Sequence, residues 1–240
     1  GRQLAFVSRR PTHAFIGVYD LRRDTIRYLA AGVDRDGLPR WSPDGARLAF
    51  VRQPGATFPS GAAPAASAGR QLPPWAIWVA EVATGEGREV WHAPIGPDAA
   101  FPSLAGDWAL AWAAGDRLVF AAEFGGWLGL YGIGVQGGDA VRLTPQGCEV
   151  EEAVFERERR HVLYTSNCGD SERRHIGRVA VAGGAPEAIT SGPTIEWSPQ
   201  PLAGGGTAFI RSDARRPGAP FVLAQGGDRP VRVAGTEPPA

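Results

Sequence analysis

The stretch Trp41–Phe50, with the sequence WSPDGARLAF, carries the signals of a complete β-hairpin. Pro43 presets the backbone φ angle at the first central position of a tight turn, Asp44 can bond back to the backbone, and Gly45 accepts the left-handed conformation that closes the hairpin. The apolar run that follows, Leu48–Val51, is typical of a strand that is buried on both faces. The stretch therefore predicts a strand, a turn and a second, buried strand.

Comparable buried strands recur along the chain at nearly constant intervals. They begin at Leu4, Leu48, Leu118, Val162 and Thr207. Three of the four intervals measure 44, 44 and 45 residues, and the remaining one, from Leu48 to Leu118, measures 70. That long interval contains segment 54–74, which is rich in Pro, Ala, Gly and Ser, and without these 21 residues it would measure 49. We therefore interpret 54–74 as a loop inserted into an otherwise regular repeat.

A repeat of about 40–50 residues with four strands is the signature of a β-propeller blade. Each interval holds two further strand candidates, and glycine pairs such as Gly137-Gly138 and Gly183-Gly184 supply the turns between them. We therefore expect an all-β fold, a β-propeller of four-stranded antiparallel blades. The expected blades cover residues 1–31, 38–95, 100–145, 149–191 and 193–235.

The propeller is expected to be incomplete. The first blade has no inner strand before Leu4, and the sequence after Val233 offers none that could close the ring, although an unclosed sheet leaves exposed edges. Segment 235–240 has the composition of a linker. We therefore expect a single propeller domain or fragment with about five blades, the first of them truncated and others missing upstream.

Composition and charge exclude several classes of partner. The 240 residues contain 25 basic and 25 acidic side chains, so there is no electrostatic footprint for nucleic acid. No apolar run approaches the roughly 18–20 residues that span a membrane. The glycines Gly132, Gly134 and Gly137 have the spacing of a dinucleotide fingerprint, but no helix follows to hold a pyrophosphate. We therefore expect no membrane span, no cofactor and, with two cysteines and four histidines, no metal site.

Several motifs follow one another in a characteristic order: Thr12–Asp20 (THAFIGVYD), Leu38–Gly45 (LPRWSPDG), Trp75–Ala80 (WAIWVA), Gly126–Tyr131 (GWLGLY), Cys148–Glu152 (CEVEE), Arg173–Val179 (RRHIGRV), Ile195–Pro199 (IEWSP) and Arg211–Pro217 (RSDARRP). In these motifs and their order the sequence resembles the N-terminal propeller of bacterial serine peptidases of the prolyl oligopeptidase family, in the branch that includes dipeptidyl peptidase IV and acylaminoacyl peptidases. The resemblance implies that the propeller precedes an α/β-hydrolase domain, gates access to it and helps to bind peptide substrates.

The catalytic part of such an enzyme is expected to lie outside these residues. No Ser in the sequence has Gly at both the second position before it and the second position after it, so the nucleophile elbow is missing, and Gly169–Arg173 comes nearest. His13, His92, His161 and His175 show no triad order with a Ser and a carboxylate. We expect no catalytic residue here, and partners that comprise a peptide substrate and a C-terminal hydrolase domain.

Glu151 and Glu152 are the first candidates for substrate binding. The resemblance implies that paired Glu side chains bind the free amino terminus of the substrate in dipeptidyl peptidases, and this is the sole adjacent Glu pair in the sequence. Adjacent strand residues point to opposite faces, however, which favours the alternative of a solvated strand.

Asp34 and Arg35 form a second candidate, because together with Asp36 they make a charged loop that could face a central cavity. A solvated turn is the alternative.

Trp127 is the third candidate. Trp41, Trp112 and Trp197 are expected to recur at one blade position and to belong to the core, whereas Trp127 breaks that register and is expected to be exposed.

Cys148 and Cys168 are expected to form a disulfide. If the hairpin turns at residues 156–160 with Phe155 opposite His161, the two cysteines face each other at its open end, provided that no bulge intervenes. Opposed antiparallel residues lie about 4.5–5.5 Å apart at Cα, within disulfide range. A disulfide predicts a periplasmic or secreted protein. Two buried, reduced cysteines are the alternative, and they would suit a cytoplasmic protein.

The sequence is consistent with two functions. The first is the non-catalytic propeller part of a serine exopeptidase or oligopeptidase. The second is a stand-alone TolB-like propeller that binds a protein or peptide, because TolB-like propellers share the Ser-Pro-Asp-Gly hairpin.

Overall fold

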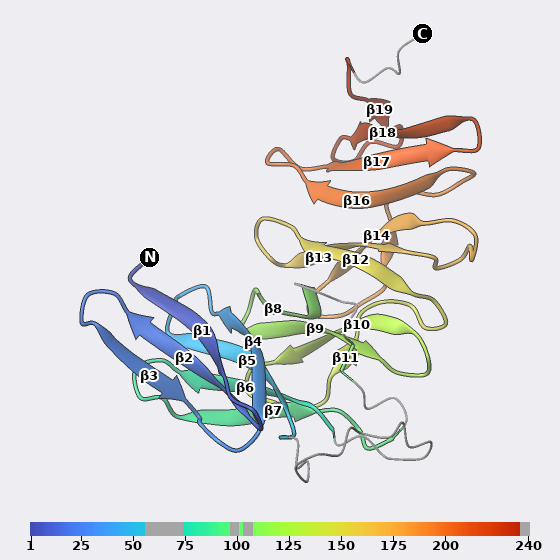
Figure 1. Cartoon of the computed structure of the whole chain (residues 1–240). Helices are drawn as coiled ribbons and strands as arrows, with labels where there is room; N and C mark the ends of the chain where they lie inside the picture. The colour runs from blue at the N-terminus through green and yellow to red at the C-terminus, as the bar shows by residue number, and fades with distance from the viewer. Residues whose placement is uncertain (56–73, 97–100, 103–107, 236–240) are drawn as a thin grey trace. The chain divides into compact units, whose positions relative to one another are not determined.

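The computed structural model describes residues 1–55, 74–96, 101–102 and 108–235, and within these ranges the regular structure consists of β-strands (Figure 1). No helix in these ranges has the length and apolar character needed to cross a membrane. The chain forms two compact units, which are described separately. The first comprises residues 1–102, 110–112 and 133–140, and the second comprises 103–109, 113–132 and 141–240.

The first unit contains a seven-stranded sheet. Its strands are β1 (Gln3–Arg9), β2 (Ala14–Asp20), β3 (Thr25–Leu29), β4 (Arg35–Trp41), β5 (Arg47–Gln53), β6 (Ala76–Glu81) and β7 (Gly87–His92). β1, β2 and β3 form one antiparallel group, and β4 to β7 form another. A single parallel pair, Ala14 with Arg35, joins β2 to β4. The sheet thus contains a three-stranded group followed by a four-stranded one, as expected for a truncated blade and a complete blade.

The other strands form three four-stranded antiparallel sheets. Their members are β8 (Leu110–Ala113), β9 (Arg117–Glu123), β10 (Leu128–Gly134) and β11 (Val141–Arg142); β12 (Val150–Phe155), β13 (His161–Ser166), β14 (His175–Ala180) and β15 (Glu187–Ala188); and β16 (Ile195–Pro201), β17 (Thr207–Asp213), β18 (Arg216–Leu223) and β19 (Val231–Arg232). In each sheet the strands are paired in chain order, which confirms the predicted four-stranded blades.

The hairpin at Trp41–Phe50 has the predicted turn. The amide of Gly45, whose φ is 71°, donates to the carbonyl oxygen of Ser42 at 2.9 Å. The Asp44 carboxylate accepts from the backbone amide of Ala46 at 3.0 Å, so it does bond back to the backbone. These hydrogen bonds and the neighbouring Ser42 hydroxyl fix the turn locally, which is why the sequence alone could predict it.

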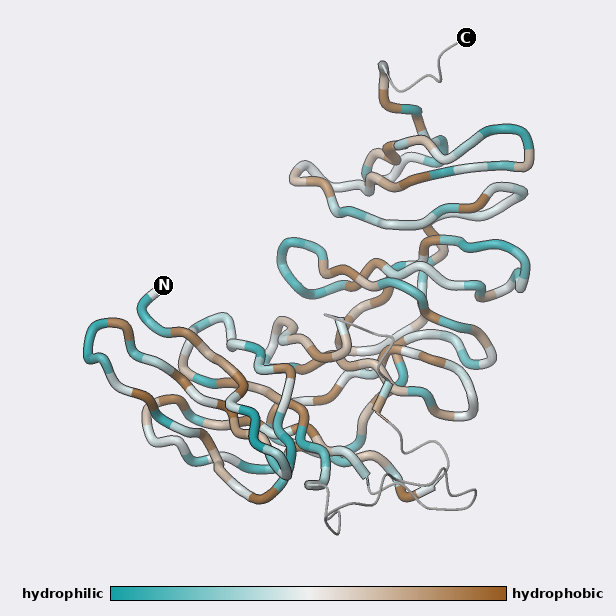
Figure 2. The backbone as a smooth tube through the Cα atoms, in the orientation of Figure 1, coloured by the Kyte–Doolittle hydropathy of each residue, from teal (hydrophilic) through white to brown (hydrophobic). Residues whose placement is uncertain are grey.

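An aromatic residue near the middle of the second strand recurs in every blade. These residues are Phe6, Phe50, Phe120, Tyr164 and Phe209. Across from Phe6 and Tyr164 the third strand carries Gly17 and Gly177, and a Cβ added at either glycine would overlap the facing ring. In two other blades the third strand carries an aromatic residue and the rings stack, Phe50 with Trp78 and Phe120 with Tyr131. In the last blade Phe209 lies opposite Phe221. Figure 2 shows brown, hydrophobic stretches within the sheets and teal, hydrophilic ones at many of the turns between strands.

The first strands of three blades contain a β-bulge. The register shifts between Gly37 and Arg40 in β4, between Val150 and Glu152 in β12, and between Trp197 and Gln200 in β16. Two of these bulges contain a residue other than glycine at positive φ, Leu38 at 51° and Ser198 at 52°, and a proline follows each of them. A bulge tolerates a proline that a regular ladder would reject, because its backbone is already partly unpaired.

The bulge in β16 overturns one expectation from the sequence. Trp41 lies opposite Leu48, next to its hairpin turn, but Trp197 lies opposite Ile210, and the residue beside the turn in β16 is Pro201, opposite Thr207. Trp197 therefore does not occupy the blade position of Trp41. The Ser-Pro dipeptide that follows each Trp suggested equivalence, but Ser42-Pro43 begins a turn whereas Ser198-Pro199 forms a bulge within a strand.

Candidate functional site

A row of four cross-strand neighbours crosses the sheet of the first unit. Arg9 at the end of β1 lies opposite Ala14 in β2, Ala14 pairs with Arg35 in β4, and Arg35 lies opposite Gln53 in β5. Side chains of residues paired in this way share one face of a sheet. The two arginines therefore flank a small alanine side chain. With neighbouring strands about 4.8 Å apart, their Cα atoms are about 10 Å apart.

This row borders a pocket of about 400 Å³. Because Ala14 and Arg35 are the sole paired residues between β2 and β4, these strands diverge beyond that point, and the pocket opens there. The basic residues that line it are Arg9, Arg10, His13 and Arg35, and its apolar wall includes Leu38 and Phe101. All three arginines are exposed.

Asp36 is the acidic residue that lines this pocket, and its charge is already paired. Its Oδ1 lies 2.7 Å from Nε of Arg52, its Oδ2 lies 2.9 Å from Nη2, and its side chain is 1% exposed. Burial raises the pKa of the Asp36 carboxyl, and the hydrogen bonds from Arg52 oppose that rise. The pocket therefore has an excess of positive charge in a chain whose formal net charge is zero.

Arg52, the partner of Asp36, is itself held by further contacts. Its Nη2 also donates to the carbonyl oxygen of Ala30 at 2.6 Å, and its guanidinium lies 4.1 Å from the centroid of the Trp78 ring. The solvated turn suggested as the alternative for residues 34–36 is therefore wrong for Asp36, which is buried in β4. Asp34 accepts a hydrogen bond from the amide of Gly55 at 3.2 Å, and Arg35, the next residue, projects into the pocket.

Glu151 and Glu152 lie in the second unit and have separate partners. The Glu151 carboxylate lies 2.5 Å from Nε of Arg174. Glu152 accepts a hydrogen bond from the backbone amide of Ser198 at 2.6 Å, and its other oxygen lies 3.3 Å from the Ser198 hydroxyl. Because Ser198 is the bulged residue of β16, Glu152 supplies the acceptor that the strand ladder does not. An amine grip by both residues remains a prediction, and each carboxylate already has a structural partner.

Trp127 lies in the connection between β9 and β10, after two glycines at positive φ, Gly125 at 71° and Gly126 at 76°. Its side chain is 39% exposed, as the sequence predicted. A role for this side chain in binding stays a prediction.

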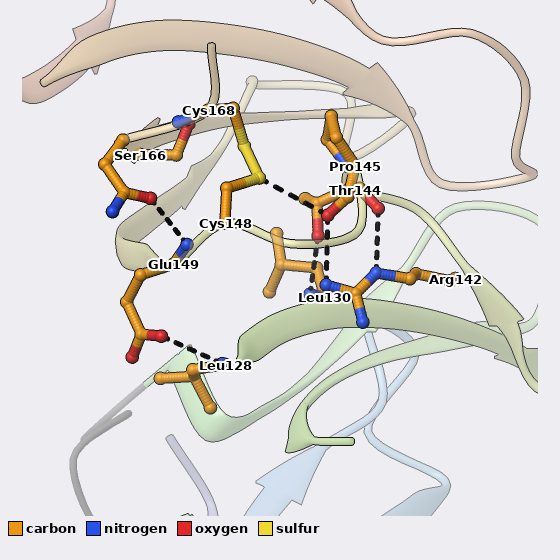
Figure 3. Close-up of a disulfide and its surroundings, with 10 residues drawn as sticks. Leu128, Leu130, Arg142, Thr144, Pro145, Cys148, Glu149, Ser166 and Cys168 are labelled. Atoms are coloured by element: carbon orange, nitrogen blue, oxygen red, sulfur yellow. Dashed lines mark hydrogen bonds between the residues drawn. A yellow bond between two sulfur atoms is a disulfide. The ribbon is translucent and has the colours of Figure 1, made fainter. Parts of the chain in front are cut away.

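Cys148 and Cys168 form a disulfide that closes the open end of the β12–β13 hairpin (Figure 3). Their Cα atoms lie 4.9 Å apart. The route by which the sequence led to this pair was wrong in two details, because Phe155 lies opposite Val162 and a bulge does intervene at Glu151. The two errors cancel: the bulge restores the register at Val150 and Ser166, next to the cysteines.

Polar contacts surround the disulfide on both sides (Figure 3). The amide of Glu149 donates to Oδ1 of Asn167 at 2.7 Å, and the Glu149 carboxylate accepts from the amide of Leu128 at 3.1 Å. Arg142 donates to the carbonyl oxygen of Pro145 at 3.0 Å. Sγ of Cys148 lies 3.5 Å from that same oxygen, but a disulfide sulfur carries no proton, so this is a van der Waals contact.

Sequence reasoning missed a buried carboxylate, Glu196 in β16, whose side chain is 0% exposed. It lies 2.8 Å from Nδ1 of His175 and 2.7 Å from Nε of Arg211, and it accepts from the Thr194 hydroxyl at 2.5 Å. Burial alone would raise the pKa of Glu196, but these hydrogen bonds outweigh it and hold the pKa below its ordinary value. Every partner is on β14, on β17 or just before β16, so the cluster joins two blades of the second unit. The sequence gives no sign that Glu196 is buried, because a charged residue within a strand is normally predicted to face solvent.

The described parts of the chain contain no group of three or more His, Cys, Asp or Glu side chains placed to hold a metal ion. The pocket beside Ala14 is the candidate site that we consider further, because it combines three arginine side chains with an apolar wall.

Comparisons with solved structures place this fold among known propellers. The chain matches a Bacteroides ovatus protein assigned to dipeptidyl aminopeptidase IV with a TM-score of 0.68 and 15% identity, over 98% of this chain and 36% of that one. It matches a Mycobacterium tuberculosis puromycin-hydrolyzing peptidase with a TM-score of 0.59 and 13% identity, over 98% and 38%. It matches TolB from Acinetobacter baumannii with a TM-score of 0.50 and 15% identity, over 95% and 51%.

At these identities the likeness confirms the β-propeller fold that the sequence predicted. The chain spans about half of the TolB chain and little more than a third of the two peptidases. No protein-family model matches the sequence, and no curated protein matches it.

Proposed function

We propose that this chain is the propeller part of a serine peptidase of the prolyl oligopeptidase family, and that it admits and helps to bind peptides for an α/β-hydrolase domain outside these residues. The observation that carries the proposal is the match over 98% of the chain to a structure assigned to dipeptidyl aminopeptidase IV, at a TM-score of 0.68. The order of the motifs between the hairpins supports the same family. The pocket beside Ala14 offers a surface that could recognise a peptide.

The disulfide supports a location in the periplasm or outside the cell, because disulfides persist in oxidising compartments and are rare in the cytosol. In this proposal the propeller contributes no catalytic group. It contributes size selection and recognition, while the nucleophile, the base and the oxyanion hole belong to the hydrolase.

The protein encoded by the whole gene tests this proposal. We expect the sequence after Ala240 to contain a strand, Gly-x-Ser-x-Gly and a helix. We also expect the purified product to react with a serine-directed fluorophosphonate and to release p-nitroaniline from aminoacyl or dipeptidyl substrates. A variant with the elbow Ser replaced by Ala is the control and should do neither. A stop codon directly after this region, or a protein that reacts with no such probe, would contradict the proposal.

A second candidate is a stand-alone, TolB-like propeller that binds a protein or peptide. It is supported by the match to TolB over 95% of this chain, at a TM-score of 0.50. The gene sequence after Ala240 distinguishes the two candidates, because the peptidase requires a hydrolase domain there and the TolB-like propeller does not.

A further inference from the structure

The pocket beside Ala14 has the features of an anion site. Arg9 and Arg35 flank Ala14 on one face of the sheet, and Arg10 lies at the rim. Among the residues that the structure describes, no carboxylate lies within ion-pairing distance of these three arginines. Elsewhere in the described chain, Arg52, Arg174, Arg178 and Arg211 each have a carboxylate partner.

The surroundings leave the positive charge of the pocket uncompensated. Asp36 lines it, but the Asp36 carboxylate is engaged by Arg52 through two hydrogen bonds and is almost completely buried. Asp34 is the other nearby carboxylate, and one of its oxygens accepts from the Gly55 amide. Three guanidinium groups therefore face at most one partly engaged carboxylate, and His13 adds a further polar group.

The geometry selects a carboxylate. A guanidinium presents its N–H groups in a planar fork that matches the two oxygens of a carboxylate. Two such forks with Cα atoms about 10 Å apart can converge on one anion above the small Ala14 side chain. The apolar wall of Leu38 and Phe101 suits the organic part of the ligand, and about 400 Å³ accommodates a short peptide segment.

We propose that this pocket binds a peptide carboxylate between the guanidinium groups of Arg9 and Arg35. The inference rests on the proposed function in taking the ligand to be a peptide. The carboxylate can belong to the C-terminus of the peptide or to an acidic side chain, since both present the same two oxygens to the arginines.

Isothermal titration calorimetry on the whole chain tests the proposal with four short N-acetylated peptides. One pair differs only in a free acid or an amide at the C-terminus. The other pair is amidated and differs only in an internal Glu or Gln. We expect one acidic member to bind about tenfold or more tightly than its neutral partner, because hydrogen bonds to charged groups are the stronger class. The pair that responds identifies the source of the carboxylate, and inorganic phosphate serves as a non-peptide anion.

The variants Arg9→Gln and Arg35→Gln should each weaken binding of the acidic peptide by about tenfold or more. The matched control is Arg22→Gln, because Arg22 is exposed in the turn after β2, at the opposite end of that strand from Ala14. Arg35 is exposed and contributes its backbone to the ladder, so its replacement should leave folding intact, which circular dichroism checks.

Equal affinity for acidic and neutral peptides, no binding of either acidic peptide, or an equal loss in the Arg22→Gln control would overturn the proposal. Binding of phosphate but of no peptide would also overturn it. These outcomes are independent of the peptidase test, because the titration needs no hydrolase domain. Carboxylate binding without peptidase activity would therefore support the proposed carboxylate site and contradict the proposed peptidase function.

Discussion

Asp36 and Arg52 form a bidentate ion pair in the interior of the first unit, with Nε to Oδ1 at 2.7 Å and Nη2 to Oδ2 at 2.9 Å. Asp36 follows Arg35 in β4, and adjacent strand residues point to opposite faces. Both residues border the pocket, Asp36 as a buried side chain and Arg35 as an exposed one, so the ion pair fixes the part of β4 that carries Arg35. The ion pair therefore positions this part of the site, but it adds no net charge to the pocket because its two charges compensate each other.

We predict that Arg52→Gln lowers the free energy of unfolding by about 3–5 kcal/mol, because it leaves the Asp36 carboxylate buried without its counter-ion. The double variant Asp36→Asn with Arg52→Gln should lose less than the sum of the two single variants. Urea denaturation of all four proteins measures this coupling. Losses that add to within about 0.5 kcal/mol would show that the two side chains do not interact energetically.

Glu151 and Glu152 are adjacent but should differ in their effect on stability. We predict that Glu152→Ala costs about 1.5–3 kcal/mol, because the bulged Ser198 amide loses a charged acceptor. Glu151→Ala removes a partly exposed ion pair with Arg174 and should cost about 0–1 kcal/mol. Urea denaturation measures both. If the two residues instead grip a substrate amine, both variants would weaken binding of a peptide with a free amino terminus to a similar degree.

The Glu196 cluster should give the protein a dependence on acidic pH. Because the pKa of Glu196 is held below its ordinary value of 4.5, its stabilisation is fully present above pH 4.5 and is lost as the pH falls through the lower folded-state pKa. We predict that Glu196→Gln costs about 3 kcal/mol at pH 7. The difference between wild type and variant should shrink below pH 4.5.

Thermal or urea unfolding between pH 7 and pH 3 measures this difference, with the exposed Glu86→Gln variant as control. A difference in the free energy of unfolding that stays constant across this range would show that the hydrogen bonds do not lower the pKa of Glu196 in the folded protein.

Replacing both Cys148 and Cys168 by Ser should lower the free energy of unfolding by about 3 kcal/mol, because the bond closes a loop with a sequence separation of 20 residues. Reduction of the wild-type protein with dithiothreitol should have the same effect and should leave the double variant unchanged. Thiol titration under denaturing conditions, without reductant, checks the bond itself. Two titratable thiols in protein purified from an oxidising compartment would contradict it.

Local signals in the sequence were sufficient for the repeating strands and for the hairpin at Trp41–Phe50. Pro43, Asp44 and Gly45 determine that turn through contacts within a few residues, and the spacing of apolar runs reports the blades directly. The four-stranded sheets follow from those two signals.

Features that depend on contacts between distant residues could not be predicted in this way. The pocket exists because Ala14 meets Arg35 in a parallel pair, and no local pattern near either residue indicates the other. The sequence predicts a charged loop at Asp36 because the partner of this residue, Arg52, lies on another strand. Two of the bulges have a weak signal in the sequence, a proline within a strand, as in Leu38-Pro39 and Ser198-Pro199.

The facing residues of the second and third strands share one limited volume, so the size of one side chain limits the size of the other. Opposite Gly17 and Gly177 a ring covers bare backbone, whereas Phe50 and Phe120 each meet another ring. A substitution on one strand therefore changes which residues its partner position can accept, so the two positions are expected to vary together among related chains. A profile that scores each position independently would miss that dependence and would underrate the similarity between blades.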